Sequence, residues 1–133
     1  MAEELPRVEI ATKVTTRSVE ETVARLIGII STRALTLFAV IDQSQQARSV
    51  GQDLRETVLV IFGDPRMHTQ VMVDSPWAAL DLPLRVLVWS DGRQTNVSYE
   101  TPRSLASRLK LRGDLATRLG GNDALTDALV APL

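Results

Sequence analysis

The sequence contains no cysteine and a single histidine, which removes several kinds of chemistry. Without cysteine there can be no disulfide, no thiolate nucleophile and no cysteine-bound metal, and the absence fits a reducing compartment. A Ser-His-Asp triad would have to use His68, and no motif marks a serine for it. The G-x-S-x-G, P-loop and G-x-G-x-x-G patterns are also missing. We therefore expect no cofactor and favour a non-catalytic role.

Long apolar runs and an excess of one charge are missing as well. The chain has 15 basic and 16 acidic residues, for a formal net charge of −1. A nearly neutral chain is a poor match for a dedicated binder of polyanions or membrane surfaces. No apolar run approaches the roughly 20 residues of a membrane-spanning helix. The acidic start, MAEELPRVEI, does not resemble a signal peptide, so we expect a cytoplasmic protein with no membrane partner.

The apolar residues that are present suffice for one domain. The 133 residues are 44% apolar and 23% charged, as in ordinary globular proteins. A chain of this length buries roughly two-thirds of its unfolded surface and needs no disulfide or metal. We expect a single domain over residues 1–133, in which residues 1–6 are flexible and residues 102–133 form a helical tail that packs on a sheet.

Five segments have the residue pattern of β-strands. They lie at residues 7–14, 35–41, 58–62, 82–89 and 95–100. The first alternates Val8, Ile10 and Val14 with polar residues, which predicts a half-buried strand. The second is apolar on both faces, which predicts a strand that is central or covered on both sides. Asp91 and Gly92, between the last two segments, predict a tight antiparallel hairpin with positive φ at both positions.

The first helix signal follows the first strand. Ser18 and Glu21 form a capping box, in which the serine oxygen accepts from the Glu21 amide and the glutamate reaches back to the serine amide. An apolar stripe at helical spacing then predicts a helix over residues 19–31. Gly28 lies inside it and costs about 1 kcal/mol relative to alanine. A close approach to a strand would explain why it is tolerated.

Further helices are expected later in the chain. Residues 43–50 form a short helix or an ordered loop. Asp64 and Pro65 suit the N-cap and first position of another helix. The C-terminal tail has apolar stripes at helical spacing, with Gly113 as a predicted stop and Asn122 as a predicted cap of the last turn.

The order of these elements indicates the fold class. Strand, helix, strand, short helix, strand and helix are followed by two strands and the helical tail. Strands and helices are mixed, and the hairpin is antiparallel. We therefore predict an α+β fold with a five-stranded, mainly antiparallel sheet and helices packed on one face.

Four segments, taken together, resemble a known family. They read IDQSQQA at 41–47, LVIFGDP at 59–65, LDLPLRVLVW at 80–89 and VSYETP at 97–102. In this order and spacing they resemble the bacterial and archaeal domain-of-unknown-function family 302. The resemblance implies an α+β sheet similar to that of the TATA-binding protein, and a homodimer. It implies no settled activity.

The chain departs from the family pattern at two positions. Gln43 stands where the family usually has histidine, and Asp64 stands where it usually has asparagine. If relatives use an Asp-His pair to bind a metal or to move a proton, this chain has lost the member of the pair that titrates near neutral pH.

Asp42 and Gln43 follow a predicted inner strand and are one candidate site. In a pocket, Asp42 would accept and Gln43 would donate hydrogen bonds to a small ligand. The alternative is that Asp42 caps the short helix that begins at Gln43, which requires no ligand.

Asp64 and His68 are a second candidate pair. At a spacing of (i, i+4) they share one helix face and could bind a metal or act as an acid–base pair. A metal site normally needs three or four protein groups, so we expect no metal. The alternative is a surface histidine paired weakly with an N-cap aspartate.

The sequence contains two further groups of candidate residues. One comprises the large apolar residues Met67, Met72, Trp77 and Trp89. They suit a hydrophobic ligand site, a core or a dimer interface. The other comprises the basic tail residues Arg103, Arg108, Lys110, Arg112 and Arg118. A basic helix can contact phosphate, but no aromatic residues lie nearby for stacking, which favours a solvated helix face over nucleic-acid binding.

Three hypotheses for function follow. The preferred one is a non-catalytic binding or interaction domain that self-associates as a homodimer. The second is a small-ligand binder or small enzyme with a pocket near Asp42 and Gln43, which Asp64 and His68 would extend. The third is weak nucleic-acid contact through the basic C-terminal helix.

Overall fold

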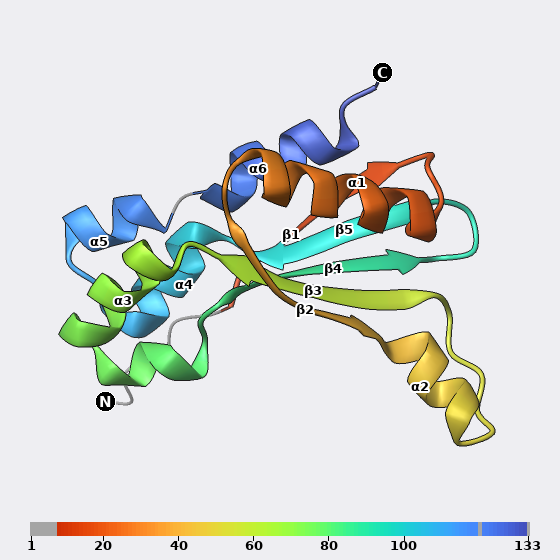
Figure 1. Ribbon diagram of the computed structural model, residues 1–133, viewed down its shortest axis with the longest axis horizontal. Helices are drawn as coiled ribbons and strands as arrows, with labels where there is room; N and C mark the ends of the chain where they lie inside the picture. Colours follow the sequence, from red (N-terminus) through yellow and green to blue (C-terminus); the bar gives the residue numbers. More distant parts are fainter. Residues whose placement is uncertain (1–7, 120, 133) are drawn as a thin grey trace, which may run out of the picture.

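The computed structural model describes residues 8–119 and 121–132, which form a five-stranded sheet with helices on one face (Figure 1). The strands are β1 (Ile10–Thr15), β2 (Thr36–Asp42), β3 (Thr57–Gly63), β4 (Leu84–Ser90) and β5 (Thr95–Glu100). Their order across the sheet is β1-β5-β4-β3-β2, and every neighbouring pair is antiparallel. The predicted α+β class is confirmed. The flexibility predicted for residues 1–6 lies outside the described residues.

Two helices lie over one face of the sheet, and the others lie beyond its two ends (Figure 1). The helices are α1 (Val19–Thr32), α2 (Gln43–Ser49), α3 (Pro65–Asp74), the 3-10 helix η1 (Pro76–Leu80), α4 (Pro102–Leu109), α5 (Gly113–Arg118) and α6 (Gly121–Val130). Helices α1 and α6 lie along one face, α3, α4 and α5 gather at one end, and α2 projects from the other end (Figure 1). Within the described ranges, none of these helices has the length and apolar character needed to cross a bilayer.

The main core lies between the sheet and the two helices α1 and α6. From the helices it takes Val19, Leu26, Ile30, Leu125 and Leu129, and from the sheet Val58, Val60, Phe62, Val86, Val88, Val97 and Tyr99. Because one apolar stripe per helix meets one face of the sheet, this layer buries both without further cover.

Helix α1 begins at the predicted cap. Ser18 Oγ accepts a hydrogen bond from the Glu21 amide at 3.0 Å, and the Glu21 carboxylate accepts from the Ser18 hydroxyl at 3.2 Å instead of from its amide. The prediction that a strand approaches Gly28 closely is wrong. A Cβ added there would meet nothing within 4 Å, so no strand approaches it closely.

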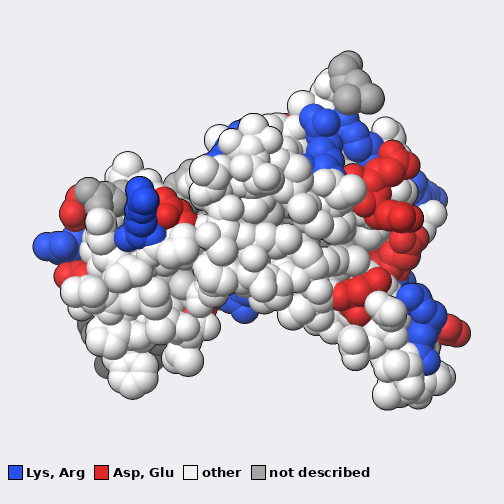
Figure 2. Space-filling view, in the orientation of Figure 1, with Lys and Arg blue, Asp and Glu red and all other residues white. Residues whose placement is uncertain are grey.

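The two edge strands differ from the sequence prediction. The apolar residues Ile10 and Val14 of β1 lie on the side away from the helices and are 60% and 48% exposed. Strand β2 is an edge strand, not an inner one, and its Leu37, Phe38 and Val40 are 38–48% exposed. Strand β2 therefore has apolar residues on both sides, although the described chain does not cover both of these sides. Figure 2 shows an uncharged area in the middle of the view, with charged side chains gathered toward the ends of the molecule.

A second, smaller core lies at the end of the sheet where α3, η1, α4 and α5 meet. It contains Val71, Ala78, Leu82, Leu105, Leu115 and Leu119. The predicted helix boundaries in the tail are wrong in detail. Lys110, with φ of 53°, ends α4, whereas Gly113 starts α5, and Asn122 lies inside α6 instead of capping it. Pro83 precedes β4, in keeping with its missing ladder donor.

The predicted hairpin joins β4 and β5, but its turn is longer than expected. Ser90 pairs with Thr95, which leaves four residues in the loop. Only Gly92 has positive φ, at 93°. Asp91 Oδ1 accepts from the amides of Arg93 and Gln94 at 2.8 and 2.9 Å, so its side chain holds the loop in place of a two-residue turn.

Candidate functional site

The described residues leave one face of the sheet without a helix over its middle. Strand pairing aligns Thr12, Ser98, Leu87, Leu59 and Ile41 in one row across all five strands on this side. We call this surface the open face, and the pairing assigns to it Ile10, Thr12, Val14, Ala39, Ile41, Thr57, Leu59, Ile61, Arg85, Leu87, Trp89, Asn96, Ser98 and Glu100. A solvated side of an antiparallel sheet is normally polar, whereas more than half of these residues are apolar.

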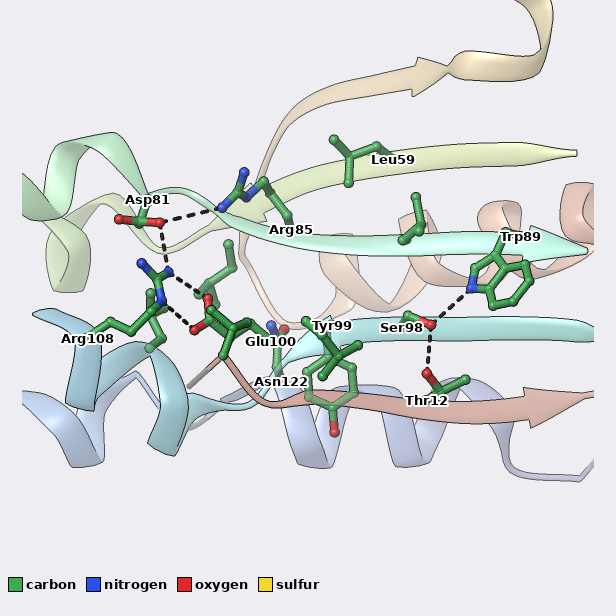
Figure 3. A pocket seen from close by; sticks show the side chains of 15 residues that line it. Thr12, Leu59, Asp81, Arg85, Trp89, Ser98, Tyr99, Glu100, Arg108 and Asn122 are labelled. Atoms are coloured by element: carbon green, nitrogen blue, oxygen red, sulfur yellow. Dashed lines mark hydrogen bonds and ion pairs between the residues drawn. The ribbon is translucent and has the colours of Figure 1, made fainter. Parts of the chain in front are cut away.

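A groove of about 670 Å³ lies on the open face (Figure 3). Leu59 and Trp89 form part of its floor, and α4 closes one end. Leu87 also lines the groove. Its volume is within the range of about 300–1,000 Å³ that is usual for ligand sites. Polar atoms in the middle are satisfied internally, because Trp89 Nε1 donates to Ser98 Oγ at 3.0 Å and the Ser98 and Thr12 hydroxyls lie 2.9 Å apart. The middle of the groove therefore presents mainly apolar surface.

The end of the groove beside α4 is charged. Arg108 donates from Nε and Nη2 to the two carboxylate oxygens of Glu100, both at 2.7 Å, and from Nη2 to Asp81 at 2.8 Å. Ser104 Oγ donates to the same Glu100 carboxylate at 2.7 Å. The Arg108 hydrogen bonds lower the pKa of Glu100, and the two carboxylates raise the pKa of Arg108. This network joins η1, β5 and α4 in a fixed arrangement.

Two groups at this end of the groove have unused hydrogen-bonding capacity. Arg85, on the open face of β4, is ion-paired with Asp81 at 3.7 Å, and its side chain is 50% exposed. Asn122 lines the groove and is 3% exposed. Its Oδ1 has no hydrogen-bond partner among the described residues. The groove thus combines an apolar floor with a guanidinium and a free acceptor at one end.

The structure does not bring together the four residues predicted to share a pocket. Asp42 is at one end of the β2–β3 pair, opposite Val58, whereas Gly63, just before Asp64, is at the other end. At about 3.3 Å per residue, these ends lie about 16 Å apart. Two separate pairs result.

Asp42 acts as a helix cap, as in the alternative interpretation. Its Oδ1 accepts from the Gln45 amide at 2.9 Å and from the Ser44 hydroxyl at 2.6 Å. These hydrogen bonds, that of Ser44 first, lower the pKa of Asp42. Gln43 is the first residue of the helix that Asp42 caps.

Asp64 and His68 lie at the start of α3. Asp64 is the N-cap and accepts from the Arg66 amide at 3.0 Å. The expectation of a surface histidine is wrong, because His68 is only 4% exposed. Burial lowers its pKa, against the smaller opposing effect of the Asp64 carboxylate. No three His, Asp or Glu side chains of residues 8–119 and 121–132 are arranged to hold a metal ion.

The other two groups of predicted residues are dispersed. Trp77 is 76% exposed on η1, Trp89 lies on the open face, and Met72 packs against the second core. In the basic tail, Arg103 and Arg108 are each paired with carboxylates, at 2.9 Å or less. Arg112 is 3.8 Å from Asp74 and 3.9 Å from Asp114. The Arg118 side chain lies outside the described residues.

Sequence reasoning missed the open face. Its residues come from all five strands, and only the register of their pairing shows that they share a side. The alternation of Val8, Ile10 and Val14 is the one signal of it within a single segment, but this alternation predicts the buried side of a strand.

A family model and a solved structure both match most of this chain. A family model described as "Domain of unknown function DUF302" matches residues 10–129. A solved structure, described as that of an uncharacterized conserved protein DUF302 from Bacillus stearothermophilus, superposes with a TM-score of 0.77 and covers 91% of this chain and 94% of its own. The two sequences are 15% identical, so this likeness concerns the fold alone.

Two proteins named as ion channels are similar to this chain in sequence. Proteins from Brucella suis biovar 1 (strain 1330) and Brucella abortus biovar 1 (strain 9-941), each named "Fluoride-specific ion channel FluC 1", are 35% identical to the chain over 104 residues. The match covers 76% of this chain but only 41% and 38% of those proteins. The chain therefore spans about two-fifths of the length of these relatives.

Proposed function

Because the chain belongs to the family described as domain of unknown function DUF302, we propose a role that rests on its surface and not on a known activity. The protein is a non-catalytic binding domain that associates with a second copy of itself through the open face. The observation that carries this proposal is the apolar content of a sheet side that the described chain leaves uncovered. Contiguous exposed apolar surface of this kind marks interaction sites.

Self-association would remove the open face from water. Burial contributes about 25 cal/mol for each Å² of apolar surface, and Ile10 and Val14 alone are 60% and 48% exposed. A two-fold dimer brings the same patch of both copies together, which suits a surface with one apolar area. The side chains of Thr12, Ser98 and Trp89 are already hydrogen-bonded to one another, so covering them leaves none of these three polar side chains without a partner.

The edge of β2 is the competing surface, because its apolar residues are also exposed. A register shift between Leu37 and Ala39 interrupts this edge. Irregularities of this kind blunt an edge as a template for pairing with another strand. On the open face, the pairing of β3 with β4 and of β4 with β5 has no register shift.

Leu59→Glu is expected to convert a dimer into a monomer, because it places a charge in the middle of the open face. The measurement is size-exclusion chromatography with light scattering at micromolar protein. The wild type should have twice the chain mass of 14.6 kDa, and the variant should have that mass once. Val73→Glu is the matched control, because Val73 is 80% exposed on α3, and it should remain dimeric.

Two results would contradict this proposal. One is a wild-type protein that is monomeric throughout the micromolar range. The other is a Leu59→Glu variant that stays dimeric while Phe38→Glu, on the edge strand, becomes monomeric. That second pattern would assign self-association to the edge of β2.

A small amphipathic acid is a second candidate occupant of the open face. The specific observation is the partly engaged guanidinium of Arg85 above an apolar groove of about 670 Å³. A carboxylate could pair with Arg85 while an alkyl or aryl chain lies over Leu59 and Leu87. Hydrogen bonds to charged groups contribute about 1.5–3 kcal/mol, so the head group should matter about tenfold or more.

The test uses Trp89 fluorescence in a Trp77→Phe background, in which Trp89 is the one remaining tryptophan. Decanoate is expected to change the emission saturably, decanol to bind at least about tenfold more weakly, and Arg85→Gln to abolish the difference. Equal binding of decanoate and decanol, or no saturation by either, would reject this candidate.

The similarity to the Brucella relatives concerns only part of their length. The ion-channel names belong to proteins much longer than this chain, and the match covers 41% or less of their length. Ion-channel activity is therefore not proposed for this chain.

A further inference from the structure

A second cavity, of about 180 Å³, lies at the end of the sheet on the side of the helices. Its lining is mostly apolar and comprises Leu35, Phe62, Met67, Leu84, Leu119 and Leu125. Arg33 and Asp64 also border it. His68 is the buried polar side chain of the lining, at 4% exposure, and the role proposed for the open face does not use it.

The local sequence fixes the imidazole in this position. Asp64 caps α3, and the His68 amide donates to the Asp64 carbonyl at 2.9 Å, so the first turn is well defined. The ring then lies against Gly63, where an added Cβ would be 2.0 Å from His68 Cε1. A side chain at position 63 would therefore force the His68 ring to move.

The imidazole has hydrogen-bonding capacity to spare. Neither ring nitrogen forms a hydrogen bond with a residue that the structure describes. Burial lowers its pKa, which favours the neutral ring at pH 7. A neutral imidazole offers one donor and one acceptor. Among the described residues, Asn122 Oδ1 is the one fully buried polar side-chain atom without a partner, so the His68 ring nitrogens have accessible surface. Because His68 lines the cavity, an occupant of the cavity would be placed to pair with them.

We propose that this cavity binds a small, mainly apolar molecule that carries one hydroxyl group, of which phenol is the simplest example. The volume sets the size, because an apolar cavity of about 150 Å³ in another protein accommodates benzene. The apolar walls select the ring, and a His68 nitrogen pairs with the hydroxyl. The site lies on the covered side of the sheet, so it is independent of self-association through the open face.

The test is NMR on the full chain with methyl-labelled methionine. Phenol is expected to shift the Met67 methyl signal saturably and to leave Met72, which does not line the cavity, nearly unchanged. Benzene has the same ring but no hydroxyl, and we expect it to bind about fivefold more weakly, as one net hydrogen bond implies. In His68→Phe the two ligands should bind equally.

Three results would overturn the proposal. They are the absence of saturable shifts with phenol, shifts of equal size at Met67 and Met72, and equal affinity of the wild type for phenol and benzene. If phenol caused no saturable shift, the cavity would hold only water. The wild-type comparison of the two ligands decides the matter even if His68→Phe does not fold. Leu59→Glu serves as a further check, because it should abolish the dimer and leave phenol binding unchanged.

Discussion

Phe62→Ala is expected to lower the free energy of unfolding by about 3–5 kcal/mol, the usual cost of deleting a buried phenyl ring. Phe62 is 1% exposed and lies on the helix side of β3, within the main core. Truncation would leave a cavity between the sheet and the helices that neighbouring side chains fill only in part. Urea denaturation followed by circular dichroism measures the loss.

Leu59→Ala is the matched control, since it removes an apolar side chain from the opposite side of the same strand. Leu59 is only partly buried, and helices α1 and α6 do not cover it. We expect a clearly smaller loss than for Phe62→Ala, measured at a protein concentration where both variants are monomeric. Equal losses would mean that the two sides of β3 are equally buried, and the assignment of the open face would be wrong.

Arg108→Met is expected to cost about 2 kcal/mol of stability at pH 7, because it leaves two carboxylates without their shared cation. Removing one member of a fully buried pair costs about 3–5 kcal/mol. The Arg108 side chain is 25% exposed, which reduces the loss. Methionine keeps much of the apolar length of arginine, so the effect isolates the charge and its hydrogen bonds to Glu100 and Asp81. Urea denaturation of both proteins provides the measurement.

The stability difference between the wild type and Arg108→Met should depend on pH. The Arg108 hydrogen bonds lower the pKa of folded Glu100 below its ordinary value of 4.5. A carboxylate with a lowered pKa contributes stability that is fully present above the ordinary value and is lost as the pH falls through the lowered value. The difference should therefore be constant near neutral pH and shrink on acidification below about pH 4.5.

Arg103→Met on the same helix is the control for this prediction. Arg103 pairs with Glu9 at 2.9 Å, but its side chain is 84% exposed. Exposed pairs contribute about 1 kcal/mol or less. If Arg103→Met and Arg108→Met cost the same, or if the Arg108 effect does not change with pH, the network at the end of the groove does not fix η1, β5 and α4 together.

Local signals in the sequence predicted most of the fold. Ser18, Asp42 and Asp64 cap helices where their spacing indicated, because a cap depends on a few neighbouring backbone groups. The hairpin at Asp91 was also found, but its turn type was not. Asp91 satisfies two loop amides with its side chain, and a two-residue turn does not need that arrangement.

The position of each strand in the sheet could not be read from its own residues. Strand β2 has apolar residues on both sides, as a central strand would, yet it forms an edge. The apolar side of β1 faces away from the helices because its register with β5 sets Thr12 opposite Ser98. Register is a property of two segments that are distant in sequence, so periodicity within one segment does not contain it.

The candidate sites depended on the same long-range information. Asp42 and Asp64 each follow a strand, but β2 and β3 are antiparallel, and the two residues lie at opposite ends of the pair. His68 was expected at the surface because helical spacing pairs it with Asp64. Its burial depends on Gly63 and on the tail helices, which only the tertiary structure brings to α3.

The most direct test of the open face as a contact surface is a distance measurement between two copies. The chain has no cysteine, so Thr12→Cys places one spin label on the open face, and Val73→Cys places one on α3 as a control. Pulsed electron paramagnetic resonance should show a defined short distance between labels at position 12 that disappears when Leu59→Glu is added, and a longer distance at position 73. A sample labelled at position 12 that shows only the unstructured background of separate monomers would contradict the account.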